Sequence, residues 1–152
     1  MLDRLPSTGR YDLSLAESTD DQSAYHGLRR TVLFEARGRF DYIPDEPEEI
    51  KERNLSLLFK LDGQAIGTVR LDQKPDGMAI VRLIAIAPDL QRQGHGTALL
   101  EQLEHLALSR GIRELLVHSA PDAVEFYQKL GFSPFEFEAG NFESVQLHKF
   151  IQ

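Results

Sequence analysis

Apolar residues along the chain follow two periods, one near two residues and one near 3.6. Short apolar or alternating runs bounded by proline, glycine or aspartate are typical of strands. Such runs cover residues 10–17, 55–61, 65–71, 78–87 and 112–119. Two more occur near the C-terminus, around Phe135 and Phe137 and over residues 145–151. The Asp62-Gly63 pair between the second and third runs predicts a hairpin turn.

The longer period predicts three helices. The first extends from capping residues at 18–21 to about Arg37 and ends at Gly38. The second follows Gly96 and ends at Gly111. The third is short and covers residues 122–130, with Asp122 as its N-cap and Glu125 at the capping-box position.

The order of these elements predicts a single domain over residues 1–152. Alternating strands and helices imply an α/β fold of mixed α+β type, in which helices cover both faces of a mixed sheet. The segment 39–53 is acidic and interrupted by prolines, so we expect a loop with one helical turn after Pro47. No internal repeat, low-complexity tract or linker divides the chain.

Composition excludes several classes of protein. The 152 residues carry a net charge of −7. This argues against general nucleic-acid binding, which depends on contacts between basic side chains and phosphates. Cysteine is absent, so disulfides and thiolate chemistry are excluded. No apolar run approaches the roughly 20 residues that cross a bilayer, and the first ten residues lack a secretory signal. We therefore expect no membrane partner and, by default, a cytoplasmic location.

The rest of the chain is organised around residues 80–111. An apolar run stops at Pro88-Asp89, a glycine-containing stretch follows at 91–97, and a leucine-rich helix begins after it. Such a turn leaves N–H groups free at the positive end of the helix dipole. Gly94 and Gly96 have no Cβ to block a close ligand. The unit therefore predicts an anion site, most naturally for phosphate.

Two common nucleotide motifs do not fit this turn. A dinucleotide fingerprint requires a third glycine where this chain has Leu99, and no ribose-binding acid follows near His118. The triphosphate-binding loop motif is absent. The stretch instead resembles the Q/R-x-x-G-x-G/A signature of the GNAT superfamily of N-acetyltransferases, with Gln91, Gly94 and Gly96 at its defining positions.

A second stretch, AVEFYQKLGF at 123–132, resembles the closing motif of the same superfamily. By this match Tyr127 protonates the departing coenzyme A thiolate. A phenol with a pKa near 10 suits the role, since it stays neutral at pH 7. The alternative is that Tyr127 only packs beside Phe126 on an amphipathic helix.

The resemblance implies acetyl-CoA as co-substrate and a mostly antiparallel, twisted sheet. The main chain at the end of the central strand would pair with pantetheine, and turn amides would hold the diphosphate. His95 would contribute only its amide, and Arg92 either adds positive charge or is simply solvated. Many members have an asparagine before the closing helix, and here Ser119 or Asp122 would take its place, Asp122 being better explained as an N-cap. The expected cofactor-binding residues are Ile84, Ala85, Ile86, Gln91, Arg92, Gln93, Gly94, His95, Gly96, Thr97, Ser119, Phe126 and Tyr127.

The general base is not assigned by the sequence. The run from Ile80 to Ile86 holds no carboxylate, although some superfamily members have a glutamate there. The candidates are His118, which has a suitable intrinsic pKa, Glu35 on the first helix, and a water chain. A hydrogen-bonded structural histidine and a solvated glutamate are the alternatives for the two side chains. The remaining histidines lack metal-ligand spacing, so no metal site is expected.

The predicted reaction is transfer of an acetyl group to a primary amine, on a small molecule or a peptide, by direct attack. The acceptor would bind near the first helix, the loop after it and the C-terminal strands. The side chains concerned are Phe34, Arg37, Arg39, Phe40, Tyr42, the acidic segment 45–49, Phe135, Phe137 and Phe142. A non-catalytic acyl-CoA-binding module is the alternative function. Acceptor identity, acyl length and oligomeric state, a homodimer included, are left open.

Overall fold

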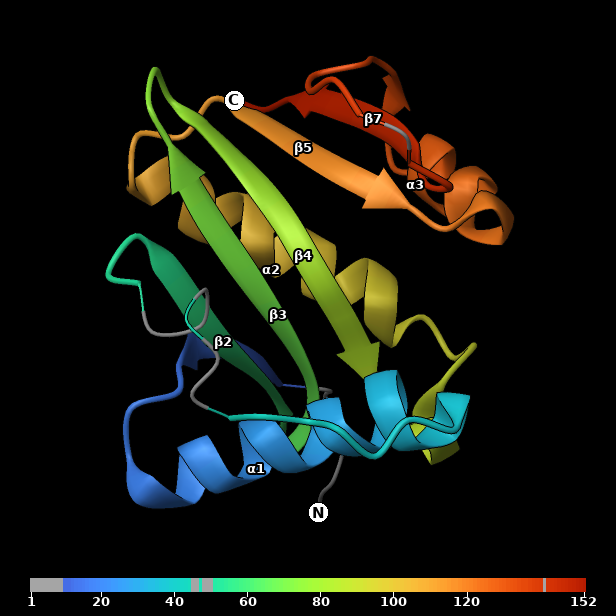
Figure 1. Ribbon diagram of the computed structural model, residues 1–152. Coiled ribbons are helices and arrows are strands. Elements are labelled where there is room, and N and C mark those ends of the chain that lie inside the picture. The colour runs from blue at the N-terminus through green and yellow to red at the C-terminus, as the bar shows by residue number, and fades with distance from the viewer. Residues whose placement is uncertain (1–9, 45–46, 48–50, 141) are drawn as a thin grey trace.

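The computed structural model describes residues 10–44, 47, 51–140 and 142–152, and its centre is a twisted seven-stranded sheet (Figure 1). The strand order is β1-β2-β3-β4-β5-β7-β6. Among the strands of the described residues, only β4 and β5 pair in parallel, so the predicted mixed and mostly antiparallel sheet is confirmed. The strands are β1 (Tyr11–Leu15), β2 (Asn54–Leu61), β3 (Gln64–Lys74), β4 (Met78–Ile86), β5 (Glu114–Ser119), β6 (Ser133–Pro134) and β7 (Val145–Phe150).

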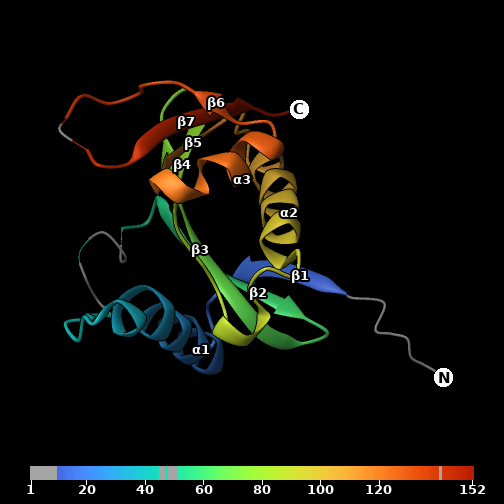
Figure 2. The same cartoon turned by 90° about the vertical axis from the view of Figure 1, so that its right-hand side faces the viewer.

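Helices cover both faces of this sheet, as expected. Helix α1 (Thr19–Arg29) lies on one face and α2 (His95–Ser109) on the other (Figure 2). Helix α3 (Val124–Lys129) follows a 3-10 turn, η4 (Pro121–Ala123), and another 3-10 turn, η3 (Pro88–Leu90), precedes α2. Within the described ranges, no helix combines the length and apolar character that crossing a membrane requires.

Strand alternation divides the core between the two faces. Leu57 and Phe59 of β2 are fully buried in the large cluster that includes Leu99 and other α2 residues. Leu58, between them in sequence, is fully buried on the opposite face against Tyr25 of α1. Because successive strand side chains point to opposite faces, one strand anchors both helices.

The first helix is less regular than its apolar stripe predicts. Ser18 caps it, since its Oγ accepts a hydrogen bond from the Asp21 amide at 3.0 Å. The α-helix ends at Arg29 and continues as a π-helical segment, η1 (Arg30–Phe34), and a 3-10 turn, η2 (Glu35–Arg37). Gly38 ends the run with φ 76°. The β-branched pair Thr31-Val32 disfavours regular helix and lies where the geometry changes.

Two predictions near the C-terminus are wrong in detail. Asp122 does not cap the last helix: it lies within η4, and the cap of α3 is Ala123, which makes no side-chain hydrogen bond. Pro121, with its fixed φ, starts a 3-10 turn before the helix instead. The sixth strand is Ser133–Pro134, not the segment around Phe135 and Phe137.

A side chain takes the place of a strand partner in that segment. The Gln146 Oε1 atom accepts hydrogen bonds from the amides of Phe137 (2.7 Å) and Glu138 (2.9 Å). Its Nε2 donates to the Glu138 carbonyl at 2.9 Å. These bonds satisfy the backbone of the segment without a ladder. The expected helical turn after Pro47 lies outside the described residues.

Candidate functional site

Strands β4 and β5 separate halfway along the sheet. They pair in parallel only from Met78–Glu114 to Val81–Val117. Beyond that point β5 continues beside β7, while β4 runs on alone to Ile86 on this side (Figure 1). In the described sheet, the main chain of β4 past Val81 therefore lacks a partner on its β5 side. An extended ligand can add to such an edge as a further strand.

A β-bulge lies at this fork. Thr68 pairs with Ala85, but Arg70 pairs with Arg82, so β4 contains one extra residue. Leu83, inside the bulge, has φ 58° and is 42% exposed. A left-handed conformation costs a non-glycine residue about 1–2 kcal/mol. Bulges re-aim the strand that contains them. The sequence offers no glycine or asparagine here, and sequence reasoning missed the bulge.

Gly67 on β3 lets the end of β4 come close. A Cβ atom there would lie 2.8 Å from the Ala85 carbonyl oxygen and 2.9 Å from Ile86 Cδ1. No other residue fits at such distances, because real Cβ atoms do not approach backbone this closely. Gly67 therefore positions the terminal residues of β4, a role that its place in a strand pattern did not reveal.

The turn after β4 presents its amides at the start of α2. Arg92 (φ 65°) and Gly94 (φ 89°) both adopt left-handed conformations. The Ala98 amide donates to the Gly94 carbonyl at 3.2 Å, which is the first turn of the helix. The amides of His95, Gly96 and Thr97 precede that bond, where a helix has no internal acceptors. They mark the positive end of a 15-residue helix.

Two glutamine side chains hold this turn in place. Gln91 Nε2 donates to the Ile86 carbonyl at 3.0 Å, and Gln93 Nε2 donates to the Asp89 carbonyl at 3.1 Å. These bonds link the turn to the end of β4. The side chains of Gln91 and Gln93 therefore stabilise the loop. Ile84 and Ala85 precede the Ile86 carbonyl that Gln91 uses.

A cavity of about 410 Å³ opens beside these amides. Its lining combines the turn with apolar side chains from β4, η3 and α3, namely Ile86, Leu90, Gln91, Arg92, Gly94, Gly96, Thr97 and Phe126. A Cβ on Gly94 would meet nothing within 4 Å, and one on Gly96 would lie 3.4 Å from the Phe126 ring. The cavity thus places the amides at the start of α2 next to an apolar wall, an arrangement that suits a ligand with both a phosphate and an apolar part.

Tyr127 lies in α3 and is 8% exposed. Its ring packs edge-on against Phe126 (5.2 Å between centroids) and Phe132 (5.5 Å). Burial raises the pKa of the Tyr127 phenol to about 12. The hydroxyl is therefore neutral throughout the physiological range and keeps a proton that it can donate in a hydrogen bond. The packing of the ring is compatible with a hydroxyl that takes part in chemistry.

His118 is held at both ring nitrogens. Its Nε2 lies 2.5 Å from Glu138 Oε1, and its Nδ1 lies 2.9 Å from Ser144 Oγ. The rings of Phe137 and Phe142 lie 4.9 and 4.6 Å from the imidazole. Sequence reasoning missed Glu138 and Ser144 because both lie in the segment before β7, far from His118 along the chain.

The other predicted residues occupy varied positions. Glu35 is exposed on η2, and no described contact joins it to Tyr127 or His118. His95 Nδ1 lies 2.9 Å from Tyr11 Oη, so its ring ties the start of α2 to β1. The buried Ser119 hydroxyl donates to the Ala120 carbonyl at 2.7 Å.

The expected acceptor surface is only partly assembled. Tyr42 packs against α1 and η1, where its ring meets Phe34 at 5.0 Å and its hydroxyl bonds to His26. Arg39 lies over the Phe34 ring and pairs with Asp41, whereas Phe40 is 82% exposed. Phe135 and Phe142 are also exposed and do not belong to the core. Most of the acidic segment lies outside the described residues.

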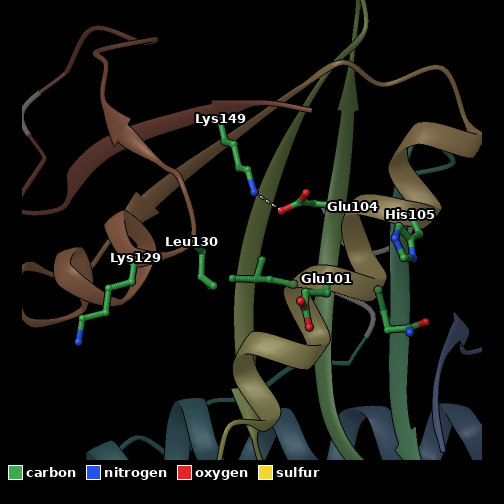
Figure 3. Close-up of a pocket in the computed structure, with 8 residues that line it drawn as sticks. Glu101, Glu104, His105, Lys129, Leu130 and Lys149 are labelled. Carbon is green, nitrogen blue, oxygen red and sulfur yellow. Dashed lines mark hydrogen bonds and ion pairs between the residues drawn. The ribbon is translucent and has the colours of Figure 1, made fainter. Parts of the chain in front are cut away.

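Another hollow, of about 550 Å³, lies between α2, the end of α3 and β7 (Figure 3). The ion pair between Glu104 and Lys149 (2.7 Å) crosses it, with Glu101, His105 and Lys129 around it (Figure 3). None of the residues that the sequence assigns to the site lines this hollow. Gly94, Gly96 and Phe126, which the sequence assigns to the cofactor site, line the cavity of about 410 Å³ instead.

Comparisons with known proteins agree with this geometry. Residues 19–132 match the profile of the Acetyltransferase (GNAT) family. Ribosomal protein bS18-alanine N-acetyltransferase from Escherichia coli (strain K12) is 33% identical over 124 residues, which are 80% of each chain. The crystal structure of the Escherichia coli ribosomal-protein-S18-alanine N-acetyltransferase has a TM-score of 0.71 at 23% identity and covers 93% of this chain and 94% of its own.

A larger protein contains the same fold. The structure of N-acetylglutamate synthase from Neisseria gonorrhoeae, complexed with coenzyme A and N-acetyl-glutamate, has a TM-score of 0.73 at 18% identity. The match covers 96% of this chain and 36% of that one. Fold and site together define an acyl-CoA-dependent transferase. The chain belongs to the GNAT family of N-acetyltransferases, enzymes whose co-substrate is acetyl-CoA.

Proposed function

We propose that this enzyme transfers the acetyl group to a primary amine by direct attack, with Tyr127 as the general acid. The proposal is supported above all by the fork between β4 and β5, because the β4 edge that it leaves open runs to Ile86, which shares a cavity with the turn that begins α2. Bound acetyl-CoA supplies an activated acyl thioester. The amides of residues 91–97 hold its diphosphate, and the main chain of Ile84 and Ala85 pairs with the pantetheine arm.

The amine first adds to the thioester carbonyl and forms the C–N bond. Tyr127 Oη then donates a hydrogen bond to the sulfur as the C–S bond breaks. A pKa of about 12 makes the phenol a poor free acid. Full transfer to a thiolate of pKa about 8.5 is uphill by roughly 5 kcal/mol. Tyr127 therefore acts through a strong hydrogen bond to the developing sulfur charge, worth most in a water-poor setting.

His118 is the proposed general base, with Ser144 as the path to it. When the Nε2–H donates to the Glu138 carboxylate, the Nδ1 lone pair accepts from the Ser144 hydroxyl. A proton from the ammonium reaches Nδ1 through that hydroxyl. Ser144→Ala is then expected to lower kcat/KM and leave acetyl-CoA affinity unchanged. Glu35 and a water chain are the other candidates for the general base. A Glu35→Gln variant that loses more activity than His118→Gln would favour Glu35.

The acceptor is proposed to be a primary amine on a small molecule or a peptide. The bS18-alanine relative acts on an alanine of a ribosomal protein, which supports including peptide N-termini among the candidates. A cytoplasmic location and a homodimer stay predictions.

One assay tests the activity. Thiol release from acetyl-CoA is measured against a panel of amino acids, polyamines and short peptides, with Tyr127→Phe as the matched variant. We expect release that depends on one class of amine and falls about 100-fold in Tyr127→Phe. Binding of acetyl-CoA without release for any amine would favour the non-catalytic module. An unchanged kcat in Tyr127→Phe would contradict the proposed role of the phenol as general acid, but not the proposed acetyl transfer.

A further inference from the structure

A buried carboxylate holds two arginines on the sheet face opposite α2. Asp72 of β3 is 2% exposed. It accepts hydrogen bonds from Arg70 Nε (2.8 Å) and Nη2 (3.0 Å), and from Arg82 Nε (2.7 Å). Three bonds to one buried carboxylate fix the orientation of both guanidinium groups. None of these residues belongs to the cofactor-binding turn.

Arg82 has hydrogen-bond donors that its contact with Asp72 does not use. Its side chain is 32% exposed, and only its Nε is bonded, so neither Nη group has an acceptor among the residues that the structure describes. The Asp72 carboxylate also accepts two hydrogen bonds from Arg70, so its single negative charge compensates the charge of Arg82 only in part. Arg82 thus presents a fixed, partly compensated cation with two free donor groups.

The position of Arg82 relates this cation to the reaction. Val81 and Val117 form the last pair between β4 and β5, so Arg82 is the first residue past the fork. His118 is the corresponding residue on β5. Val81 and Val117 belong to the core on the α2 face, and side chains alternate along a strand. Arg82 and His118 therefore lie on the same face, the one that Figure 1 presents to the viewer in front of α2.

We propose that Arg82 binds a carboxylate on the acceptor, so that the substrates are amines that also carry a carboxylate, such as free amino acids. This inference rests on the proposed acetyl transfer. A guanidinium fixed at Nε by a buried partner offers its Nη donors in the planar arrangement that a carboxylate fits. In a chain with a net charge of −7, an anionic acceptor needs such a local cation.

The test uses pairs of acceptors that differ only in this group. Each L-amino acid and its carboxamide are assayed for thiol release with wild type, Arg82→Gln, Arg82→Lys and the control Arg110→Gln, which changes an exposed arginine after the end of α2. For the accepted side chains, we expect the acid to exceed the amide in kcat/KM by about 10- to 100-fold. In Arg82→Gln this preference falls below about threefold, while the amide rate changes less than threefold.

Binding measurements separate the remaining explanations. The dissociation constant for acetyl-CoA is expected to be equal in wild type and Arg82→Gln. Weaker acetyl-CoA binding in Arg82→Gln would mean that the cation serves the cofactor and would overturn the inference. Two other results would also overturn the inference while leaving the proposed acetyl transfer in place. One is a preference for the acid over the amide that persists in Arg82→Gln, and the other is equal kcat/KM for acids and amides in wild type. No release from any acid, amide, polyamine or peptide would contradict the proposed activity, and this inference with it.

Discussion

The buried phenol of Tyr127 makes a quantitative prediction about stability at high pH. Its pKa rises from 10.0 to about 12 on folding because burial penalises the tyrosinate. The folded state therefore holds this proton more tightly than the unfolded chain. The resulting stability is fully present below pH 10 and is lost as the pH rises toward 12. Tyr127→Phe removes the titrating group and with it this loss.

The size of the effect follows from the two pKa values. A shift of two units corresponds to about 2.7 kcal/mol between the plateaus. The linkage relation gives a loss of about 0.4 kcal/mol at pH 10 and about 1.4 kcal/mol at pH 11. All other tyrosines and lysines titrate in both proteins, so they cancel when the two free energies of unfolding are subtracted. Only Tyr127 remains in the difference.

The assay is urea denaturation of wild type and Tyr127→Phe at half-unit steps from pH 8 to 11. The stability of Tyr127→Phe relative to wild type is expected to rise by about 1.4 kcal/mol over this range. A difference that stays flat would refute the reasoning, because the phenol would then be as solvated in the folded protein as in the unfolded chain. Tyrosinate absorbance, followed in parallel, should show that Tyr127→Phe lacks one tyrosine that titrates at high pH in wild type.

Three further predictions concern backbone packing, buried charge and the base. Gly67→Ala is expected to cost about 1–3 kcal/mol in urea denaturation, because its Cβ would meet the Ala85 carbonyl at 2.8 Å. The control Gly27→Ala, in open space within α1, should stabilise by up to about 1 kcal/mol. Asp72→Asn is expected to cost about 3–5 kcal/mol, since it removes the buried negative charge that pairs with both Arg70 and Arg82; a cost below 1 kcal/mol would contradict this. His118→Gln should lower kcat/KM about 100-fold or more at pH 7 and leave the acetyl-CoA dissociation constant unchanged.

The features that can be predicted from the sequence are those that depend on neighbouring residues in the chain. The Asp62-Gly63 hairpin and the glycine turn at Gly94 were expected because their residue types fix backbone conformation, and both are present. Contacts between distant segments were not expected. The Gln146 side chain that replaces a strand partner, and the Glu138 and Ser144 contacts of His118, join residues that have no shared spacing in sequence. Such contacts exist only once the sheet has set the register of β5 and β7.

The bulge in β4 shows how packing and function are coupled in this fold. Val81, Ile84 and Ile86 all contact the core on the α2 face. A regular strand would place Val81 and Ile84 on opposite faces, because they are three residues apart. One extra residue, Leu83, restores the phase at the cost of its left-handed conformation. The sequence from Leu83 to Ala87 conceals this requirement, since each of these five apolar residues looks equally fit for the core. The same extra residue falls immediately after Arg82, so the core side chains themselves determine where β4 turns away and where its main chain becomes available to a ligand.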